Sequence, residues 1–205
     1  LSLVLTHPND ESMFLTPLLE HLRQSPYVAQ HELQIRLLTL SRGDYTGKGD
    51  KRAHELQEVC HKYNMQCTVL DVPETQDGPN FWDQDKVASH IQRFVEEGRS
   101  QVLITFDQYG GDSHPNHIST FHAVTSAKNR LPGVKVWSLH SYGMLSKYFP
   151  LLAILRSMFN APSVIVFSPF EVTRNMAIHG SQNKWYTTLL AFVSSYSYTN
   201  SFTTI

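Results

Sequence analysis

Two short polar segments contain the side chains with the clearest capacity for chemistry. The first segment holds His7 and Asp10, the second holds His114 and His117, and the members of each pair are three positions apart. Two imidazoles and one carboxylate suit Zn²⁺ or another divalent metal and leave a position for water. A metal held there would lower the pKa of water toward about 7 and so create a nucleophile at neutral pH.

The elements around these segments decide whether they can meet. Short apolar strands are expected at residues 3–5, 33–40, 67–70, 102–104, 134–137 and 163–167, and helices at 11–24, 50–64, 87–98, 116–128, 169–182 and 185–196. This alternation predicts an α/β, Rossmann-like fold with a mostly parallel sheet and helices on both faces. Ligands of such sheets bind beyond the carboxyl ends of the strands, where both polar segments are expected to lie. Either segment alone would be a weak signal for a metal, because histidines also serve structural roles at helix starts.

Composition narrows the class of protein. The chain has 205 residues, with 17 basic and 18 acidic side chains, and no run of like charges. We therefore expect one domain over residues 1–205 and no nucleic-acid partner. No Gly-x-Gly-x-x-Gly follows the first strand, so a dinucleotide site is not favoured. No signal peptide or membrane-spanning run is visible, and because a strand begins at the first residues we expect an upstream segment, with a membrane anchor as one candidate.

The two cysteines, Cys60 and Cys67, are too few for the dense pairing of a secreted disulfide framework. We predict that both are reduced thiols in a reducing compartment. A metal role for Cys60 and the adjacent His61 is less favoured, because no second ligand pair accompanies them.

The polar segments and several further stretches resemble the PIG-L superfamily of zinc de-N-acetylases. The family's His-Pro-Asp-Asp-Glu motif stands here as His-Pro-Asn-Asp-Glu at 7–11, and its Asp-x-x-Gly-x-x-x-His-x-x-His motif occupies 107–117. Residues 40–49 with Arg52, Glu55 and Leu56, residues 176–182, and residues 200–202 resemble the eukaryotic branch. The resemblance covers essentially the whole chain. It implies hydrolysis of the N-acetyl group of N-acetylglucosaminyl-phosphatidylinositol in GPI-anchor biosynthesis.

The resemblance also implies roles for individual residues. His7, Asp10 and His117 would be the metal ligands, and His114 would stabilise the oxyanion or protonate the leaving amine. Arg52 would contact substrate, with an exposed helix charge as the alternative. His179 would line the pocket or play a structural role, which we favour. Asp112 is acidic where some bacterial relatives have a tyrosine that helps to polarise the amide carbonyl, and we do not assign that role to the nearby but displaced Tyr109.

Asn9 departs from the family pattern, which has an aspartate there as general base. An amide cannot take up a proton at physiological pH, although it can still position a water. Loss of a general base typically removes about 10²–10⁴ in rate. Either Asn9 is an engineered substitution, which we favour because the other motif positions are intact, or it is native in a slow enzyme or a non-catalytic subunit.

A lipid substrate implies contact with a membrane surface. Residues 148–159 are unusually apolar and form either an interfacial rim or a core helix, the reading we favour; burial of Phe149, Leu152 and Phe159 against the sheet would exclude the rim. The implied location is the cytoplasmic face of the endoplasmic reticulum membrane, and the absence of an Asn-x-Ser/Thr acceptor agrees with it.

Two other functions stay open at this point. One is a soluble deacetylase of N-acetylglucosaminyl small molecules. The other is a non-catalytic metal-binding module, which a native Asn9 would favour.

Overall fold

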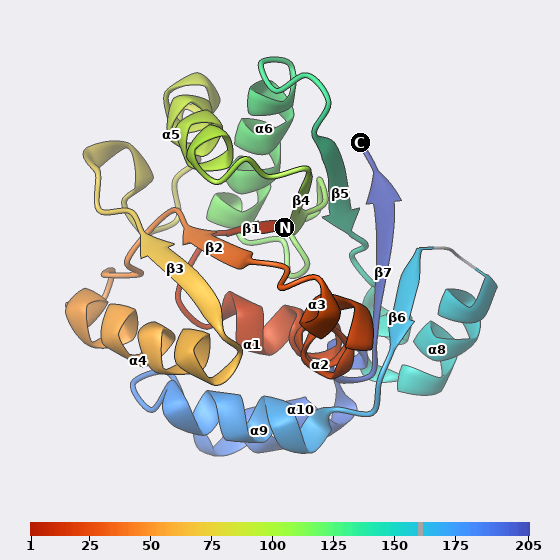
Figure 1. Cartoon of the computed structure of the whole chain (residues 1–205). Helices are drawn as coiled ribbons and strands as arrows, with labels where there is room; N and C mark the ends of the chain where they lie inside the picture. The colour runs from red at the N-terminus through yellow and green to blue at the C-terminus, as the bar shows by residue number, and fades with distance from the viewer. Residues whose placement is uncertain (160–161) are drawn as a thin grey trace. The chain divides into compact units, whose positions relative to one another are not determined.

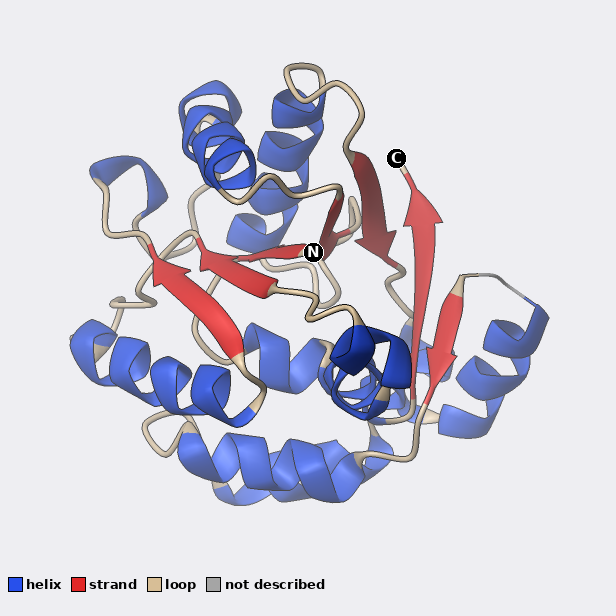
Figure 2. Cartoon of the chain, in the orientation of Figure 1, coloured by secondary structure: helices blue, strands red, loops and turns tan. Residues whose placement is uncertain are grey.

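The computed structural model describes residues 1–159 and 162–205. The chain divides into two compact units. Unit 1 comprises Leu1–Pro8, Gln34–Ser141 and Thr203–Ile205, and unit 2 comprises Asn9–Leu33 and Tyr142–Phe202. The helices and strands of the two units are labelled in Figure 1 and coloured by type in Figure 2.

Unit 1 is built on a parallel sheet in the order β3-β2-β1-β4-β5. Its elements in chain order are β1 (Ser2–Leu5), β2 (Ile35–Thr39), α4 (Gly49–Lys62), β3 (Met65–Val69), the 3₁₀ turn η1 (Pro73–Thr75), α5 (Gln84–Glu97), β4 (Val102–Phe106), α6 (Pro115–Lys128) and β5 (Lys135–Leu139). Helix α4 lies on one side of this sheet, and α5 and α6 lie on the other (Figure 1). The predicted α/β, Rossmann-like fold is confirmed.

The core of unit 1 follows the periodicity of the sequence. Helix α5 buries Val87, Ile91, Phe94 and Val95 at helical spacing, and α6 adds a face of small residues that allows the two helices to pack closely. Asp83 caps α5 by accepting hydrogen bonds from the amides of the next turn. A fully buried side chain such as Ile91 contributes roughly 1.5–3 kcal/mol of transfer free energy. This packing holds the strands whose carboxyl ends carry the polar segments.

Unit 2 is mostly helical. Its elements are α1 (Asp10–Phe14), α2 (Thr16–Gln24), α3 (Pro26–Gln30), α7 (Met144–Tyr148), α8 (Pro150–Phe159), β6 (Ser163–Ile165), α9 (Pro169–Ile178), α10 (Trp185–Val193), the 3₁₀ turn η2 (Ser195–Ser197) and β7 (Thr199–Thr204). Strand β6 pairs antiparallel with β7. Strand β7 belongs to both units, because its last residues are part of unit 1, where the amide of Ile205 donates to the carbonyl of Val136. The full order is β3-β2-β1-β4-β5-β7-β6, a mixed and mostly parallel sheet.

The predicted helix at 11–24 is two helices. The break falls at Leu15, and Pro17 opens the second helix, where a missing amide hydrogen is tolerated. Asn200 stabilises this break from β7, since its side chain accepts from the amide of Leu18 and donates to the carbonyl of Phe14. Strand β7 itself was not predicted, because its polar sequence does not show the alternation of a half-buried strand.

The prediction of two reduced thiols is wrong. Cys60, in the last turn of α4, and Cys67, in β3, form a disulfide with their Cα atoms 6.2 Å apart. The helix and strand are joined by a short turn, so the chain returns within disulfide distance after seven residues. A single local bridge of this kind depends on tertiary geometry and not on the number of cysteines.

Candidate metal centre

His117 is held in an orientation that leaves one ring nitrogen available. Its Nδ1 lies 2.9 Å from the carbonyl oxygen of Gly110 and 3.0 Å from Oδ1 of Asp112. Two acceptors at Nδ1 require the proton there, so Nε2 carries the lone pair that a metal needs. The ring also stacks on Phe106, with centroids 4.4 Å apart. Gly110 permits this approach, because a Cβ at that position would lie 2.7 Å from Cβ of His117.

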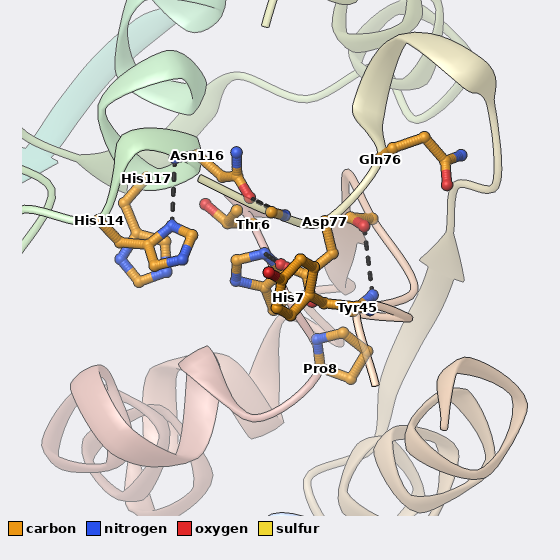
Figure 3. A network of polar contacts seen from close by, with 12 residues as sticks. Thr6, His7, Pro8, Tyr45, Gln76, Asp77, His114, Asn116 and His117 are labelled. Atoms are coloured by element: carbon orange, nitrogen blue, oxygen red, sulfur yellow. Dashed lines mark hydrogen bonds and ion pairs between the residues drawn. The ribbon is translucent and has the colours of Figure 1, made fainter. Parts of the chain in front are cut away.

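His7 follows β1 and faces both histidines of the second segment. Its ring centroid lies 5.2 Å from that of His114 and 5.4 Å from that of His117 (Figure 3). Its Nε2 lies 3.0 Å from Oδ1 of Asp77. The strands β1 and β4 are neighbours, so the two polar segments meet at one sheet edge as predicted.

Asp10 completes the predicted ligand set. It is the first residue of α1, buried, and only three positions after His7. One ligand atom from each of His7, Asp10 and His117 lies within 4.8 Å of the other two. All three side chains are buried, which fits a divalent metal ion better than a set of solvated charges.

Asp77 was not predicted. It lies in the loop after β3, where it accepts from the amide of Tyr45 at 3.3 Å (Figure 3). Its Oδ2 also lies 3.6 Å from Nη1 of Arg52. Burial alone would raise the pKa of Asp77, but the hydrogen bond and charge of His7, with the Tyr45 amide and Arg52, hold this pKa below its ordinary value. An ionised carboxylate beside His7 can orient that imidazole. The end of the third strand was the signal that could have identified Asp77.

His114 caps helix α6. Its Nδ1 accepts from the amide of Asn116 at 3.2 Å, so the neutral ring carries its proton on Nε2. Burial, followed by the charges of His7 and His117, lowers the pKa of His114. The ring is therefore suited to act as a neutral donor toward a developing oxyanion.

Arg52 is buried and not an exposed helix charge. Its Nη1 donates to the carbonyl of Gly43 at 2.7 Å, and its Nη2 donates to the carbonyl of Pro8 at 3.0 Å. Gly43 has a φ of +69°, and a Cβ there would lie 2.3 Å from the guanidinium carbon. Arg52 thus fastens the loop after β2 to the segment that follows His7. A substrate contact for Arg52 stays a prediction.

Two further motif residues hold the loops of this edge in place. Asn116 accepts from the amide of Gly78 at 3.2 Å and donates to the carbonyl of Asn80 at 2.7 Å, which anchors the loop that carries Asp77. Asp107 accepts from the amide and hydroxyl of Ser141, which joins the ends of β4 and β5. These contacts explain why the motif contains polar residues that are not metal ligands.

Asn9 and His179 both belong to unit 2. Asn9 has a φ of 114°, a left-handed conformation that asparagine and aspartate adopt more readily than most residues. His179 is fully buried, with Nε2 2.6 Å from Oε1 of Glu11. Glu11 also accepts from the hydroxyl of Ser12 and the amide of Asn9. This pair supports the structural role for His179, which is closed to solvent in this conformation.

An open cavity of about 470 Å³ lies beside this edge of unit 1. Asp77 forms part of its wall, together with Tyr45, Phe81, Trp82 and Lys86. The cavity therefore places space for a ligand next to the carboxylate that contacts His7.

Sequence comparison identifies the family. A family model described as GlcNAc-PI de-N-acetylase, PIG-L, matches residues 2–128, which include both polar segments. The chain belongs to the PIG-L family. It is 32% identical over 97% of its length to N-acetylglucosaminyl-phosphatidylinositol de-N-acetylase of Bos taurus, of which it covers 81%. It is 30% identical over 96% of its length to a probable enzyme of the same name from Schizosaccharomyces pombe, of which it covers 83%.

The PIG-L fold is also seen in a solved structure. N,N'-diacetylchitobiose deacetylase from Pyrococcus horikoshii matches all of this chain and 82% of its own, with a TM-score of 0.66 and 13% identity. At this identity the match shows the fold alone. PIG-L deacetylases depend on a metal, and the buried His-Asp-His group is the place where the described residues of this chain would hold it.

Proposed function

We propose that this chain hydrolyses the N-acetyl group of N-acetylglucosaminyl-phosphatidylinositol to give the free amine and acetate, a step of GPI-anchor biosynthesis. The observation that carries the proposal is the buried group of His7, Asp10 and His117, with ligand atoms within 4.8 Å of one another. This group occurs in a chain that matches, over nearly its full length, relatives named N-acetylglucosaminyl-phosphatidylinositol de-N-acetylase.

We propose Zn²⁺ as the metal, held by His7, Asp10 and His117. Nitrogen and carboxylate ligands in this number are typical of catalytic zinc sites. When bound, the metal would supply an activated water and polarise the amide carbonyl. Asp112, by its contact at Nδ1 of His117, would hold that ring in the tautomer whose lone pair is on Nε2. Asp77, by its contact at Nε2 of His7, would hold that ring in the other tautomer, whose lone pair is on Nδ1.

His114 would act on the substrate. Its Nε2–H, set by the hydrogen bond from the Asn116 amide to Nδ1, is the donor that an oxyanion would meet. The leaving nitrogen must gain a proton to depart as an amine, and His114 would supply it only as the imidazolium, because a neutral imidazole that gave up its Nε2 proton would become an anion.

Asn9 at the general-base position provides the decisive test. We expect Asn9→Asp to release acetate from N-acetylglucosaminyl-phosphatidylinositol at least about 100-fold faster than the unchanged chain, because a carboxylate can accept the proton of the attacking water. Both proteins should be assayed at equal zinc occupancy. The φ of 114° at this position suits either residue, so the substitution should leave the fold intact.

The other outcomes separate the alternatives. Activity of Asn9→Asp toward N-acetylglucosaminyl-inositol without lipid, and none toward the lipid, would favour a soluble deacetylase. Zinc binding by both proteins without activity of either would favour a non-catalytic metal-binding module. His114→Ala in the Asn9→Asp background is the control that ties activity to this site.

We propose that the protein acts at the cytoplasmic face of the endoplasmic reticulum membrane, in contact with the membrane surface and not with nucleic acid. The support is a lipid substrate together with the exposure of Phe149, Leu152 and Phe159, three residues whose burial would have excluded an interfacial rim. The Cys60–Cys67 disulfide argues against this location, because disulfides are rare in the cytosol.

A further inference from the structure

In three helices of unit 2 the large apolar side chains are exposed and the small side chains are buried. In α8 the large apolar residues Leu151, Leu152, Leu155, Met158 and Phe159 form a stripe at helical spacing, and they are between 47% and 88% exposed. The residues that α8 buries are small, Ala153 and Ser157. The hydroxyl of Ser157 forms hydrogen bonds with those of Thr199 and Ser201 on β7. Helix α8 therefore packs through its small side and presents its large side to solvent.

Helices α7 and α10 repeat this arrangement. Helix α7 exposes Met144, Leu145 and Tyr148 while it buries Ser146, and α10 exposes Trp185, Tyr186, Leu189 and Phe192 while it buries Thr187 and Ala191. All three helices pack against the turn η2, so they belong to one part of unit 2. We call these outward residues of α7, α8 and α10 the apolar stripes. Large exposed apolar side chains that gather on neighbouring helices mark sites of interaction with another protein or with a membrane.

The charges nearby indicate the kind of partner. Residues 142–205 contain four basic side chains, Lys147, Arg156, Arg174 and Lys184, and a single acidic one, Glu171. Arg174 forms an ion pair with Glu171, so the acid is already neutralised. The formal charge of residues 142–205 is therefore +3 (four basic against one acidic), whereas the chain as a whole carries a net charge of −1. An apolar surface flanked by cations complements an anionic lipid bilayer.

The lengths of these helices indicate how the apolar stripes would meet a membrane. Among the described residues, no helix combines the length and hydrophobicity needed to cross a bilayer. Helix α8 has ten residues and α10 has nine, which suits insertion to the level of the headgroups. Trp185 and Tyr186 at the start of α10 are the residue types that favour this level.

We propose that the apolar stripes of α7, α8 and α10 insert into the headgroup–acyl boundary of an anionic bilayer. This inference rests on the proposed function, because a lipid substrate must be reached from the membrane that contains it. The stripes would hold the protein at the surface by direct contact of its own side chains.

The test measures binding to vesicles that contain no substrate. The full chain is mixed with phosphatidylcholine vesicles with and without phosphatidylinositol, and the bound fraction is separated by flotation. We expect binding to the vesicles with phosphatidylinositol and a loss of at least about tenfold in the partition coefficient for Leu155→Ser/Phe159→Ser, since two large apolar side chains leave the boundary. These residues are 55% and 88% exposed, so their replacement should leave the fold unchanged.

Tyr27→Ser is the matched control, because Tyr27 is a 62% exposed aromatic residue of unit 2 that lies on α3, outside the stripes. It should bind vesicles like the unchanged chain. Equal loss in the control, or no binding by the unchanged chain, would overturn the proposal. A concentration-dependent dimer that Leu155→Ser/Phe159→Ser dissociates, without vesicle binding, would assign the stripes to self-association instead.

Failure of the membrane contact and failure of the proposed enzymatic function give different results when vesicle binding and deacetylation are both measured. Deacetylation of an acyl-free N-acetylglucosaminyl-inositol phosphate by Asn9→Asp, without vesicle binding, would overturn the membrane contact and leave the chemistry standing. Vesicle binding without deacetylation of either substrate would support the contact and remove the enzymatic assignment.

Discussion

At the scale of single residues, the candidate metal centre depends on side chains that do not themselves bind metal. Asp112 and the carbonyl of Gly110 fix the tautomer of His117, and Asp77 contacts the ring of His7. Such partners make a histidine a stronger and better oriented ligand. Asp112 was a departure from the family pattern, and the structure shows that it holds a predicted metal ligand.

Asp77 should therefore matter for metal affinity. We expect Asp77→Asn to weaken zinc binding by about 10–100-fold, because the amide orients His7 less strongly and removes a negative charge. Competition with a chromogenic chelator measures the change. Asp50→Asn is the control, since the Asp50 side chain is 94% exposed and remote from His7 in its contacts. Unchanged or tighter zinc binding by a folded Asp77→Asn would show that Asp77 does not orient a ligand.

At the scale of elements, the disulfide joins helix α4 to strand β3. Arg52 lies on the same helix and fastens the loop after β2 and the segment after His7. A bridge in the last turn of α4 limits how far this helix can move from the sheet. The disulfide therefore supports the element that positions part of the metal centre.

Reduction of Cys60–Cys67 should lower stability. A loop of this length predicts a loss of about 2 kcal/mol in the free energy of unfolding, or roughly 4–8 °C in melting temperature for a chain of this size. Thermal unfolding with and without a thiol reductant measures it. Cys60→Ala/Cys67→Ala should melt at the same temperature in both conditions. Two free thiols in the unfolded, unreduced protein would show that the bridge does not form.

The helices of unit 2 show that a sequence pattern can predict an apolar helix face without predicting whether that face is buried. The stripe of α8 has the spacing of a core helix, which is the alternative we favoured for residues 148–159. The direction of a stripe depends on which side of the helix finds a partner. Here the small side of α8 meets β7, so the large side is left exposed, and the core-helix prediction is wrong.

At the scale of the whole molecule, metal binding should couple to folding. A ligand that binds only the folded state adds about 2.7 kcal/mol at one hundred times its dissociation constant. We expect removal of zinc by a chelator to lower the melting temperature and its return to restore it. His117→Ala should lose most of this zinc-dependent increment, because it removes a proposed ligand. A melting temperature that is independent of zinc in the unchanged chain would contradict the metal centre.

The sequence alone predicted the alternating strands and helices of unit 1 and the side chains proposed for the metal site. Alternating apolar strands and amphipathic helices permit few arrangements, and a parallel sheet brings the ends of β1 and β4 to one edge. His7, Asp10, His114 and His117 could be found on this basis, and the family motifs extended the assignment to the substrate. These features depend on local periodicity and on short separations along the chain.

Only the tertiary structure decided the contacts between distant segments. Asp77 approaches His7 across about 70 residues, and Arg52 donates to the carbonyl of Pro8 across 44 residues, and no local pattern encodes either contact. The outward direction of the apolar stripes has the same origin, because burial is a property of the pair of surfaces that meet. The sequence defines which side chains are present, and tertiary packing determines which of them are in contact.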